Sequence, residues 1–333
     1  MSLASFVPEQ FKHLEDPSRD LPRIAKDPSG MSVISAAVEQ IPTRHQLLLG
    51  DARRSVLLDD SAHLVLTSPP YWTLKEYRRT EGQLGWITHY DEFLEQLDEV
   101  WSICHRALVP GGRLICVVGD VCLSRRKNDG RHTVVPLHAS IQERCRKIGF
   151  DNLAPIIWHK IANVAHEVER GTGGFLGKPY EPNAVIKNDI EFILMQRKPG
   201  GYRKPSIAAR TLSLLSEENF KSYFRQIWTD IAGASTRDHP APFPVALADR
   251  LVRMFSFVGD TVLDPFTGTA STQIAAAKCG RNSIGIEIDP VYYGKAVDRF
   301  VSKTTSLLRK VEIRTGKIEA ERELRVFGKE VSV

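Results

Sequence analysis

Four consecutive residues, Ser68-Pro69-Pro70-Tyr71, have types and spacing that could bind a flat molecule by its edge and its face. They follow the apolar run "HLVLT", which predicts a buried strand that ends at this corner. The prolines fix the backbone and remove two amide donors, so the Ser68 hydroxyl and the Pro69 carbonyl can serve as acceptors beside an aromatic ring. This arrangement is complementary to a planar base with an exocyclic NH2 group. A proline turn whose tyrosine packs in the core is the alternative.

A second candidate site is "TVLDPFTGTASTQIAAAKCGRNSIGIEIDP", residues 261–290. Its pattern predicts a strand, a tight turn from Asp264 to Gly268, a helix, and a second strand that ends near Glu287. Open α/β sheets bind ligands at the carboxyl ends of strands, where a carboxylate about twenty residues beyond such a turn can accept both ribose hydroxyls. Because there is no GxGxxG and no Walker lysine, a nucleoside-like cofactor without phosphates is favoured. An ordinary strand-to-helix turn is the alternative.

The elements that would position these residues alternate between short apolar runs and amphipathic stretches. Strands are predicted at "HQLLLGD", "HLVLTS", "RLICVVGD", "LAPIIWHK", "DIEFILMQ", "DTVLDPF" and "NSIGIEID". Helices are predicted at "YDEFLEQLDEVWSICHRAL", "PLHASIQERCRKIGF", "PVALADRLVRMFS" and "STQIAAAKCG". Strands separated by crossover helices predict an α/β fold with a doubly wound, mostly parallel, Rossmann-like sheet.

Composition is that of an ordinary globular protein. The 333 residues are 42% hydrophobic and 26% charged, and no stretch approaches the roughly 18 apolar residues of a membrane span. The N-terminus has no apolar signal-peptide core, so a cytoplasmic protein without membrane contact is expected. Five cysteines form no CxxC pair and no metal-ligand spacing, which predicts reduced thiols and no metal site. The net charge of +5 permits an anionic partner such as nucleic acid without proving one.

Together the two sites resemble those of bacterial DNA amino-methyltransferases that use S-adenosyl-L-methionine. In that family the base-binding tetrapeptide is Asp-, Asn- or Ser-Pro-Pro plus an aromatic residue, and the cofactor motif resembles Asp-Pro-Phe-x-Gly-Ser/Thr-Gly. "LLLGD", "GGRLICVVGD", "IIWHK" and "HPAPFP" also fall in the expected order, over about residues 45–300. The base-binding motif precedes the cofactor motif, which is the order of the β group. The match departs at Ala270, where many relatives have a second glycine; a positive φ there would carry a cost and could reduce cofactor affinity.

The resemblance implies roles for individual residues. The catalytic corner Ser68, Pro69, Pro70 and Tyr71 would hold the target base, with the base stacked on Tyr71. Asp51 would meet the cofactor adenine, Glu287 the ribose, and Asp264 the methionine end. The expected cofactor-binding residues are Asp51, His239, Phe243, Asp264, Pro265, Phe266, Gly268, Thr269 and Glu287.

Five parts are expected along the chain. Residues 1–43 form an N-terminal arm or short helical lead-in, and residues 44–160 form the catalytic half of the methyltransferase domain. Residues 161–230 are the candidate target-recognition region, although "DIEFILMQ" within them belongs to the sheet. Residues 231–305 form the cofactor-binding half, and residues 306–333 a C-terminal tail.

The first residue of the tetrapeptide bears on the target. In the family, Ser usually accompanies N4 of cytosine and Asp usually accompanies N6 of adenine. We therefore expect methylation of cytosine N4 in double-stranded DNA by base flipping and direct in-line transfer, with adenine N6 as the alternative. Attack on cytosine C5 is disfavoured because no cysteine follows a proline.

Further partners and rival functions complete these expectations. A restriction endonuclease that acts on the same DNA site and a second copy of the chain are expected as partners. One rival is a DNA-binding protein that keeps the fold but has lost methyl transfer. The other is an RNA or protein-glutamine methyltransferase, whose tetrapeptide usually begins with Asn.

Overall fold

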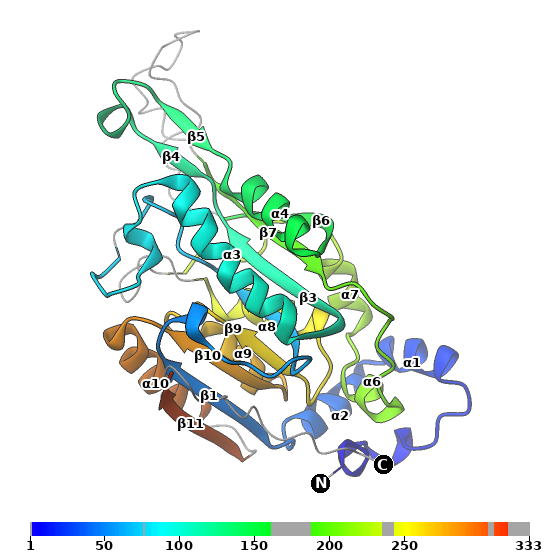
Figure 1. The fold of residues 1–333 in the computed structure, drawn as a ribbon. Coiled ribbons are helices and arrows are strands. Elements are labelled where there is room, and N and C mark those ends of the chain that lie inside the picture. Colours follow the sequence, from blue (N-terminus) through cyan, green and yellow to red (C-terminus); the bar gives the residue numbers. More distant parts are fainter. Residues whose placement is uncertain (1, 76, 161–187, 235–242, 306–309, 319–333) are drawn as a thin grey trace, which may run out of the picture.

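A single large sheet forms the centre of the structure, a computed structural model that describes residues 2–75, 77–160, 188–234, 243–305 and 310–318 (Figure 1). Within these residues the sheet has nine strands in the order β11-β1-β10-β9-β2-β3-β7-β6-β8. Neighbouring strands are parallel except at β7, which is antiparallel to both β3 and β6. The strands are β1 Thr43–Leu49, β2 Ala62–Thr67, β3 Leu108–Val118, β6 Asp151–His159, β7 Ile190–Arg197, β8 Ile227–Trp228, β9 Thr261–Asp264, β10 Asn282–Glu287 and β11 Val311–Lys317.

Helices cover both faces of this sheet, which confirms the predicted doubly wound α/β fold. Val65 of β2 packs in the cluster that contains α3 and α4, whereas Leu64 and Leu66 pack in the cluster that contains α8 and α9. This alternation is what a strand covered on both faces requires. The helices are α1 Pro17–Ala25, α2 Pro28–Val38, α3 Tyr90–Ala107, α4 Leu137–Ile148, α6 Ile207–Leu212, α7 Glu217–Tyr223, α8 Val245–Phe255, α9 Ser271–Lys278 and α10 Pro290–Thr304.

Both terminal regions pack against the rest of the structure. In the N-terminal segment, Ile34 and Val38 of α2 are buried against Leu212 and Val258. In the expected C-terminal tail, residues 311–317 form β11, which pairs in parallel with β1 at the edge of the sheet. Its sequence VEIRTGK has few apolar residues and did not predict a strand, because an edge strand buries little surface.

The candidate target-recognition region is partly built into the same sheet. Residues 161–187 lie outside the described residues. Of the rest, β7 is the strand predicted at "DIEFILMQ", and β8 adds a short strand beside β6. Between them α6 and α7 pack near α1 and α2 at the lower end of the molecule in Figure 1. A separate hairpin of β4 (Val121–Leu123) and β5 (Thr133–Val135) extends from the other end.

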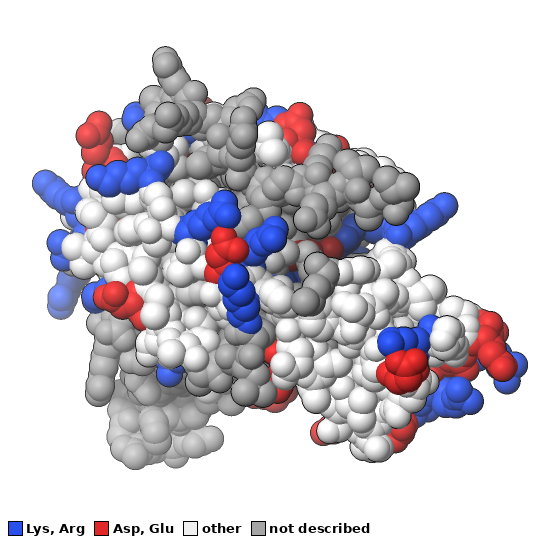
Figure 2. All heavy atoms as spheres, turned by 90° about the horizontal axis from the view of Figure 1, so that it is seen from below, with Lys and Arg blue, Asp and Glu red and all other residues white. Residues whose placement is uncertain are grey.

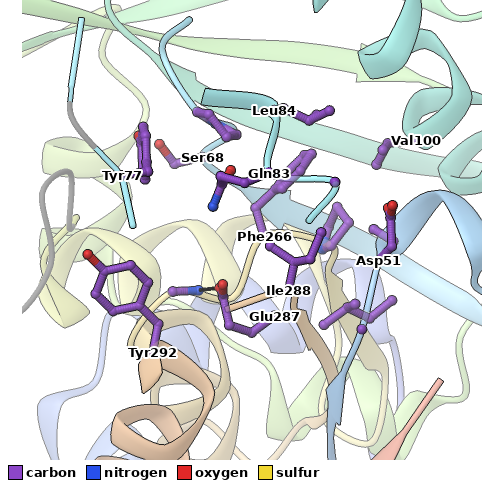
Figure 3. Close-up of a pocket in the computed structure, with 17 residues that line it drawn as sticks. Asp51, Ser68, Tyr77, Gln83, Leu84, Val100, Phe266, Glu287, Ile288 and Tyr292 are labelled. Atoms are coloured by element: carbon purple, nitrogen blue, oxygen red, sulfur yellow. Dashed lines mark hydrogen bonds between the residues drawn. The ribbon is translucent and has the colours of Figure 1, made fainter. Parts of the chain in front are cut away.

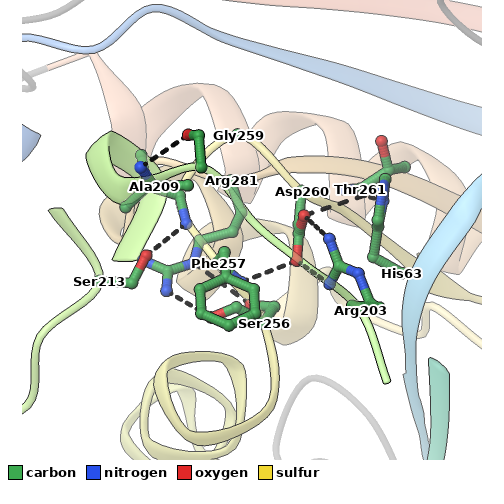
Figure 4. Close-up of polar contacts among 12 residues, drawn as sticks. His63, Arg203, Ala209, Ser213, Ser256, Phe257, Gly259, Asp260, Thr261 and Arg281 are labelled. Atoms are coloured by element: carbon green, nitrogen blue, oxygen red, sulfur yellow. Dashed lines mark hydrogen bonds and ion pairs between the residues drawn. The ribbon is translucent and has the colours of Figure 1, made fainter. Parts of the chain in front are cut away.

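Asp260 fastens the segment before α6 to the start of β9 (Figure 4). Arg203 donates from Nη1 to Oδ2 and from Nη2 to Oδ1 of Asp260, each at 2.6 Å. The same Oδ2 accepts the Phe257 amide at 2.7 Å, and Asp260 is almost fully buried. Nearby, the buried Arg281 guanidinium donates to the carbonyl of Ser256 at 2.7 Å. The loop that leads into the cofactor strand is therefore held by buried charged hydrogen bonds.

We expect Asp260→Asn to lower the free energy of unfolding by roughly 1–3 kcal/mol, because the half-buried Arg203 loses the buried carboxylate that accepts both of its hydrogen bonds. Urea denaturation measures this change. Asp59→Asn is the matched control, since Asp59 pairs with Arg106 at 3.1 Å on the surface and such pairs contribute little. Equal losses in the two variants would contradict the role assigned to Asp260.

Candidate active site

The two sequence motifs meet because their strands are neighbours. Residues Leu64 and Val65 of β2 are in register with Val262 and Leu263 of β9. The strands are parallel, so the base-binding corner after β2 and the cofactor turn after β9 emerge at the same edge of the sheet. One pocket is lined by residues of both motifs, of the β1 and β10 ends, of the connection from β2 to α3, and of α3 and α10 (Figure 3). They are Gly50, Asp51, Ala52, Ser68, Pro70, Tyr77, Gly82, Gln83, Leu84, Val100, Pro265, Phe266, Gly268, Ile286, Glu287, Ile288 and Tyr292.

A buried hydrogen bond ties the two motifs together. The Thr67 hydroxyl donates to Oδ1 of Asp264 at 2.6 Å, and that oxygen also accepts the Phe266 amide at 3.0 Å. Burial raises the pKa of the Asp264 carboxyl to about 6. Asp264 is not among the residues that line the pocket. Its Oδ1 therefore braces the turn. The contact expected with the methionine end of a cofactor stays a prediction.

The turn itself places small and apolar groups at the pocket. Pro265, Phe266 and Gly268 line it, whereas Thr269 lies outside the lining and its carbonyl accepts from Arg299 at 2.6 Å. Gly268 has a φ of 53°, which suits glycine. The departure noted at Ala270 does fall on a left-handed residue, with φ 64°. Alanine there carries backbone strain that a second glycine would avoid.

Glu287 is the buried carboxylate of the pocket. Its Oε2 accepts the Gly268 amide at 2.8 Å and its Oε1 accepts the Asp289 amide at 2.9 Å. Burial raises the pKa of the Glu287 carboxyl to about 7, the largest effect on this group. A carboxylate has about four lone-pair sites, so each oxygen can still accept a hydroxyl. The geometry therefore fits a group with two hydroxyls, such as a ribose.

Asp51 lies at the same pocket but is already paired. It follows β1 and caps the short helix Ala52–Arg54 by accepting the Arg53 amide at 3.0 Å. The Arg53 side chain donates to both Asp51 oxygens, at 2.9 Å and 3.0 Å from Nε. Asp51, the residue expected to contact the cofactor adenine, therefore lies at the pocket wall, and Arg53 orients its carboxylate.

Several lining residues were missed by sequence reasoning. Tyr77, Gln83 and Leu84 come from the long connection between β2 and α3, which has no periodic pattern. Ile288 and Tyr292 follow Glu287, and their nearness to that carboxylate is the signal that could have found them. In Figure 3, Tyr77, Gln83 and Leu84 lie on one side of the pocket, and Ile288 and Tyr292 lie on the other.

The base-binding corner is divided between pocket and core. Ser68 and Pro70 line the pocket, whereas Pro69 and Tyr71 are buried, with Tyr71 only 4% exposed. The Tyr71 hydroxyl lies 3.1 Å from Ser68 Oγ and 3.3 Å from Glu191 Oε2. Burial raises the pKa of Tyr71 well above its ordinary value, so the phenol keeps its proton. The exposed stacking face expected of Tyr71 is not present in this structure.

Of the remaining expected cofactor residues, Phe243 is not among those that line the pocket. Phe243 packs in the hydrophobic cluster between α8 and the sheet. His239 lies outside the described residues.

We expect Thr67→Val to lower the free energy of unfolding by roughly 1–3 kcal/mol, because the buried Asp264 carboxyl loses a hydroxyl donor. Thermal or urea denaturation near neutral pH measures the loss. Thr305→Val is the control, since the exposed Thr305 hydroxyl, just after α10, donates to the Val301 carbonyl of that helix. A variant with wild-type stability would show that this bond does not hold the two motifs.

Known proteins share both the sequence and the fold. A DNA methylase family matches residues 62–298. Type II methyltransferase M.MjaI of Methanocaldococcus jannaschii is 36% identical over 280 residues, which cover 75% of this chain and 88% of that protein. Type II methyltransferase M.MthZI of Methanothermobacter thermautotrophicus is 31% identical over 296 residues, covering 82% and 80%.

A solved structure adds the cofactor. The putative DNA modification methylase TTHA0409 of Thermus thermophilus, crystallised in complex with S-adenosyl-L-methionine, is 52% identical with a TM-score of 0.64, over 80% of this chain and 99% of that chain. Among the described residues, no helix has the length and apolar character that a membrane span needs. On the extent of the family match and the identity with these relatives, the chain belongs to the DNA methylase family and is an S-adenosyl-L-methionine-dependent DNA amino-methyltransferase.

Proposed function

We propose that this protein methylates the exocyclic N4 amine of cytosine in duplex DNA. The observation that carries the proposal is one pocket that contains both Ser68 of the base-binding corner and Glu287 of the cofactor wall. A neutral serine hydroxyl can accept from an amine without the cost of a buried charge. Adenine N6 is the alternative target, because the family contains enzymes for both amines.

The residues of the pocket fit S-adenosyl-L-methionine. Glu287 has free acceptor capacity for two ribose hydroxyls, and the apolar groups of Phe266, Leu84 and Val100 suit an adenine ring. Gly268 leaves room for the chain to approach a ligand closely. When bound, the cofactor supplies an electrophilic methyl group on a sulfonium.

The base-binding corner has a separate task in this mechanism. The target base leaves the duplex so that its amine reaches the pocket. The amine donates to the Ser68 hydroxyl and to the Pro69 carbonyl, which draws the nitrogen lone pair out of conjugation with the ring. Holding the amine in line with the cofactor supplies most of the rate, because both reactants are then oriented and desolvated.

We propose that short local segments of the chain, and not one broad basic surface, contact the DNA. Figure 2 shows Lys and Arg on one face interspersed with Asp, Glu and uncharged residues, without one broad basic surface. Within residues 161–230, the residues before and after strand β7 are proposed to select the DNA sequence, because β7 itself belongs to the sheet. The names of M.MjaI and M.MthZI as Type II methyltransferases support a place in a restriction-modification system with an endonuclease of the same specificity. A homodimer stays a prediction.

Nucleoside mass spectrometry tests the target amine. After reaction with plasmid DNA of diverse sequence, we expect N4-methylcytosine, and Ser68→Ala should lower the methylation rate while cofactor affinity stays nearly intact. Ser140→Ala is the control, because Ser140 also bonds a tyrosine hydroxyl, that of Tyr90 at 2.9 Å, away from the pocket. N6-methyladenine as the product would replace cytosine as the target, and no methylated base at all would contradict the proposal.

Cofactor affinity should depend on pH through Glu287. Its pKa of about 7 means that the carboxyl is largely protonated below that pH, whereas ribose hydroxyls donate to the ionised form. Binding must then release a proton, so affinity should fall as pH drops, by about fivefold between pH 7 and pH 6 and by close to tenfold per unit below about pH 6. Calorimetry should give a flat affinity above about pH 8.

Two substitutions isolate this group. Above about pH 8, where Glu287 is ionised, Glu287→Ala should weaken cofactor binding by roughly 1.5–3 kcal/mol. Glu287→Gln should remove most of the pH dependence of cofactor affinity. Glu143→Gln serves as the surface control, because Glu143 is exposed and pairs with Arg146. Unchanged affinity in a folded Glu287→Ala protein would remove Glu287 from the cofactor site.

A further inference from the structure

A chain of hydrogen bonds leads from the base-binding serine into the interior. Ser68 Oγ lies 3.1 Å from Tyr71 Oη, which lies 3.3 Å from Glu191 Oε2. The other carboxylate oxygen of Glu191 accepts from Lys160 Nζ at 2.6 Å. Tyr71 and Glu191 are 4% and 7% exposed, so water cannot readily replace these partners. The chain thus joins the corner after β2 to β7 and to the end of β6.

The chemistry of these groups fixes the direction of the chain. Lysine ammonium can only donate and a carboxylate can only accept. Tyr71 has one hydroxyl proton, and apart from Ser68 the groups within hydrogen-bonding distance of it are acceptors, Glu191 Oε2 and the Val117 carbonyl at 3.4 Å. The charged carboxylate of Glu191 is a stronger acceptor than a serine hydroxyl, which favours donation of the Tyr71 proton to Glu191. Tyr71 then faces Ser68 with lone pairs only, and the Ser68 hydroxyl donates inward to Tyr71.

The orientation of Ser68 decides what it can bind. With its proton committed to Tyr71, the hydroxyl presents lone pairs to the pocket that it lines. An amine on the target base can donate a hydrogen bond to these lone pairs. A keto oxygen is itself an acceptor, so it cannot form a hydrogen bond with Ser68 in this orientation. Mispairing of this kind leaves two buried acceptors opposed, which is costly.

We propose that Tyr71 is a positioning residue that, held by Glu191 and Lys160, fixes the Ser68 hydroxyl as an acceptor and so selects bases with an exocyclic amine over keto bases. This inference deepens the proposed function and rests on it. It gives the buried Tyr71 hydroxyl a role of its own.

Tyr71→Phe is the direct test, because it removes only the hydroxyl. Loss of a hydrogen bond of this kind should lower the single-turnover rate of methyl transfer by about tenfold, with saturating cofactor and DNA. Glu191→Gln should also lower the rate, since its amide can donate to Tyr71 and free the tyrosine proton for Ser68. Tyr90→Phe is the matched control: it makes the same chemical change in another serine–tyrosine pair, with Ser140, and should retain the wild-type rate.

A double-mutant cycle separates positioning from mere structural damage. If Tyr71 acts through Ser68, Tyr71→Phe should change the rate less than about twofold in the Ser68→Ala background, because the group that it orients is gone. An equal loss in both backgrounds would overturn the inference, as would a wild-type rate for Tyr71→Phe alone.

Binding gives a second readout that needs no turnover. We compare duplexes that carry the normal target base with duplexes in which hydrogen replaces its exocyclic amine. The wild-type protein should prefer the amine-bearing site by about fivefold or more, and Tyr71→Phe should lose most of this preference with cofactor affinity unchanged. A preserved preference would overturn the inference. If the wild-type protein methylates no DNA, the proposed function itself is wrong. If the wild-type protein methylates DNA but the effects of Tyr71→Phe and Ser68→Ala are additive, only the role of Tyr71 is wrong.

Discussion

The hydrogen bond between Thr67 and Asp264 is the contact on which the site depends. It joins two residues that lie 197 positions apart, each at the end of a strand and each next to a functional motif. Because Asp264 also holds the Phe266 amide, movement of the β2 end would disturb the cofactor turn directly. Parallel pairing of β2 and β9 brings the motifs close, and this buried bond sets how they face each other.

Much of the fold was predictable because its core elements carry strong local patterns. The runs at β3, β7, β9 and β10 are short and apolar, and α3 has its buried residues at helical spacing. The edge strand β11 was not predictable, because Glu312, Arg314 and Lys317 dominate its sequence. Antiparallel β7 among parallel neighbours likewise follows from tertiary packing, which a single strand's pattern does not encode.

The candidate site divides in the same way. Glu287, Gly268 and Ser68 were found because their chemistry and their position after a strand point to a ligand. The sequence also placed Tyr71 correctly at the corner but did not reveal that its ring is buried, since its acceptor Glu191 lies 120 positions away. Residues of the β2–α3 connection, such as Tyr77 and Gln83, reach the pocket through a path that no periodicity describes. Strand ends were therefore predictable, and long connections were not.

The position of β1 has a consequence for synthesis of the protein. This strand is made early, yet it lies between β10 and β11, and His45 bonds to Ser283 across 238 residues. A nascent chain on the ribosome therefore exposes β1 without a partner until the second half of the cofactor domain has been translated. Gly50 and Asp51 can meet Glu287 only then, so the pocket is completed after the base-binding corner has already been synthesised.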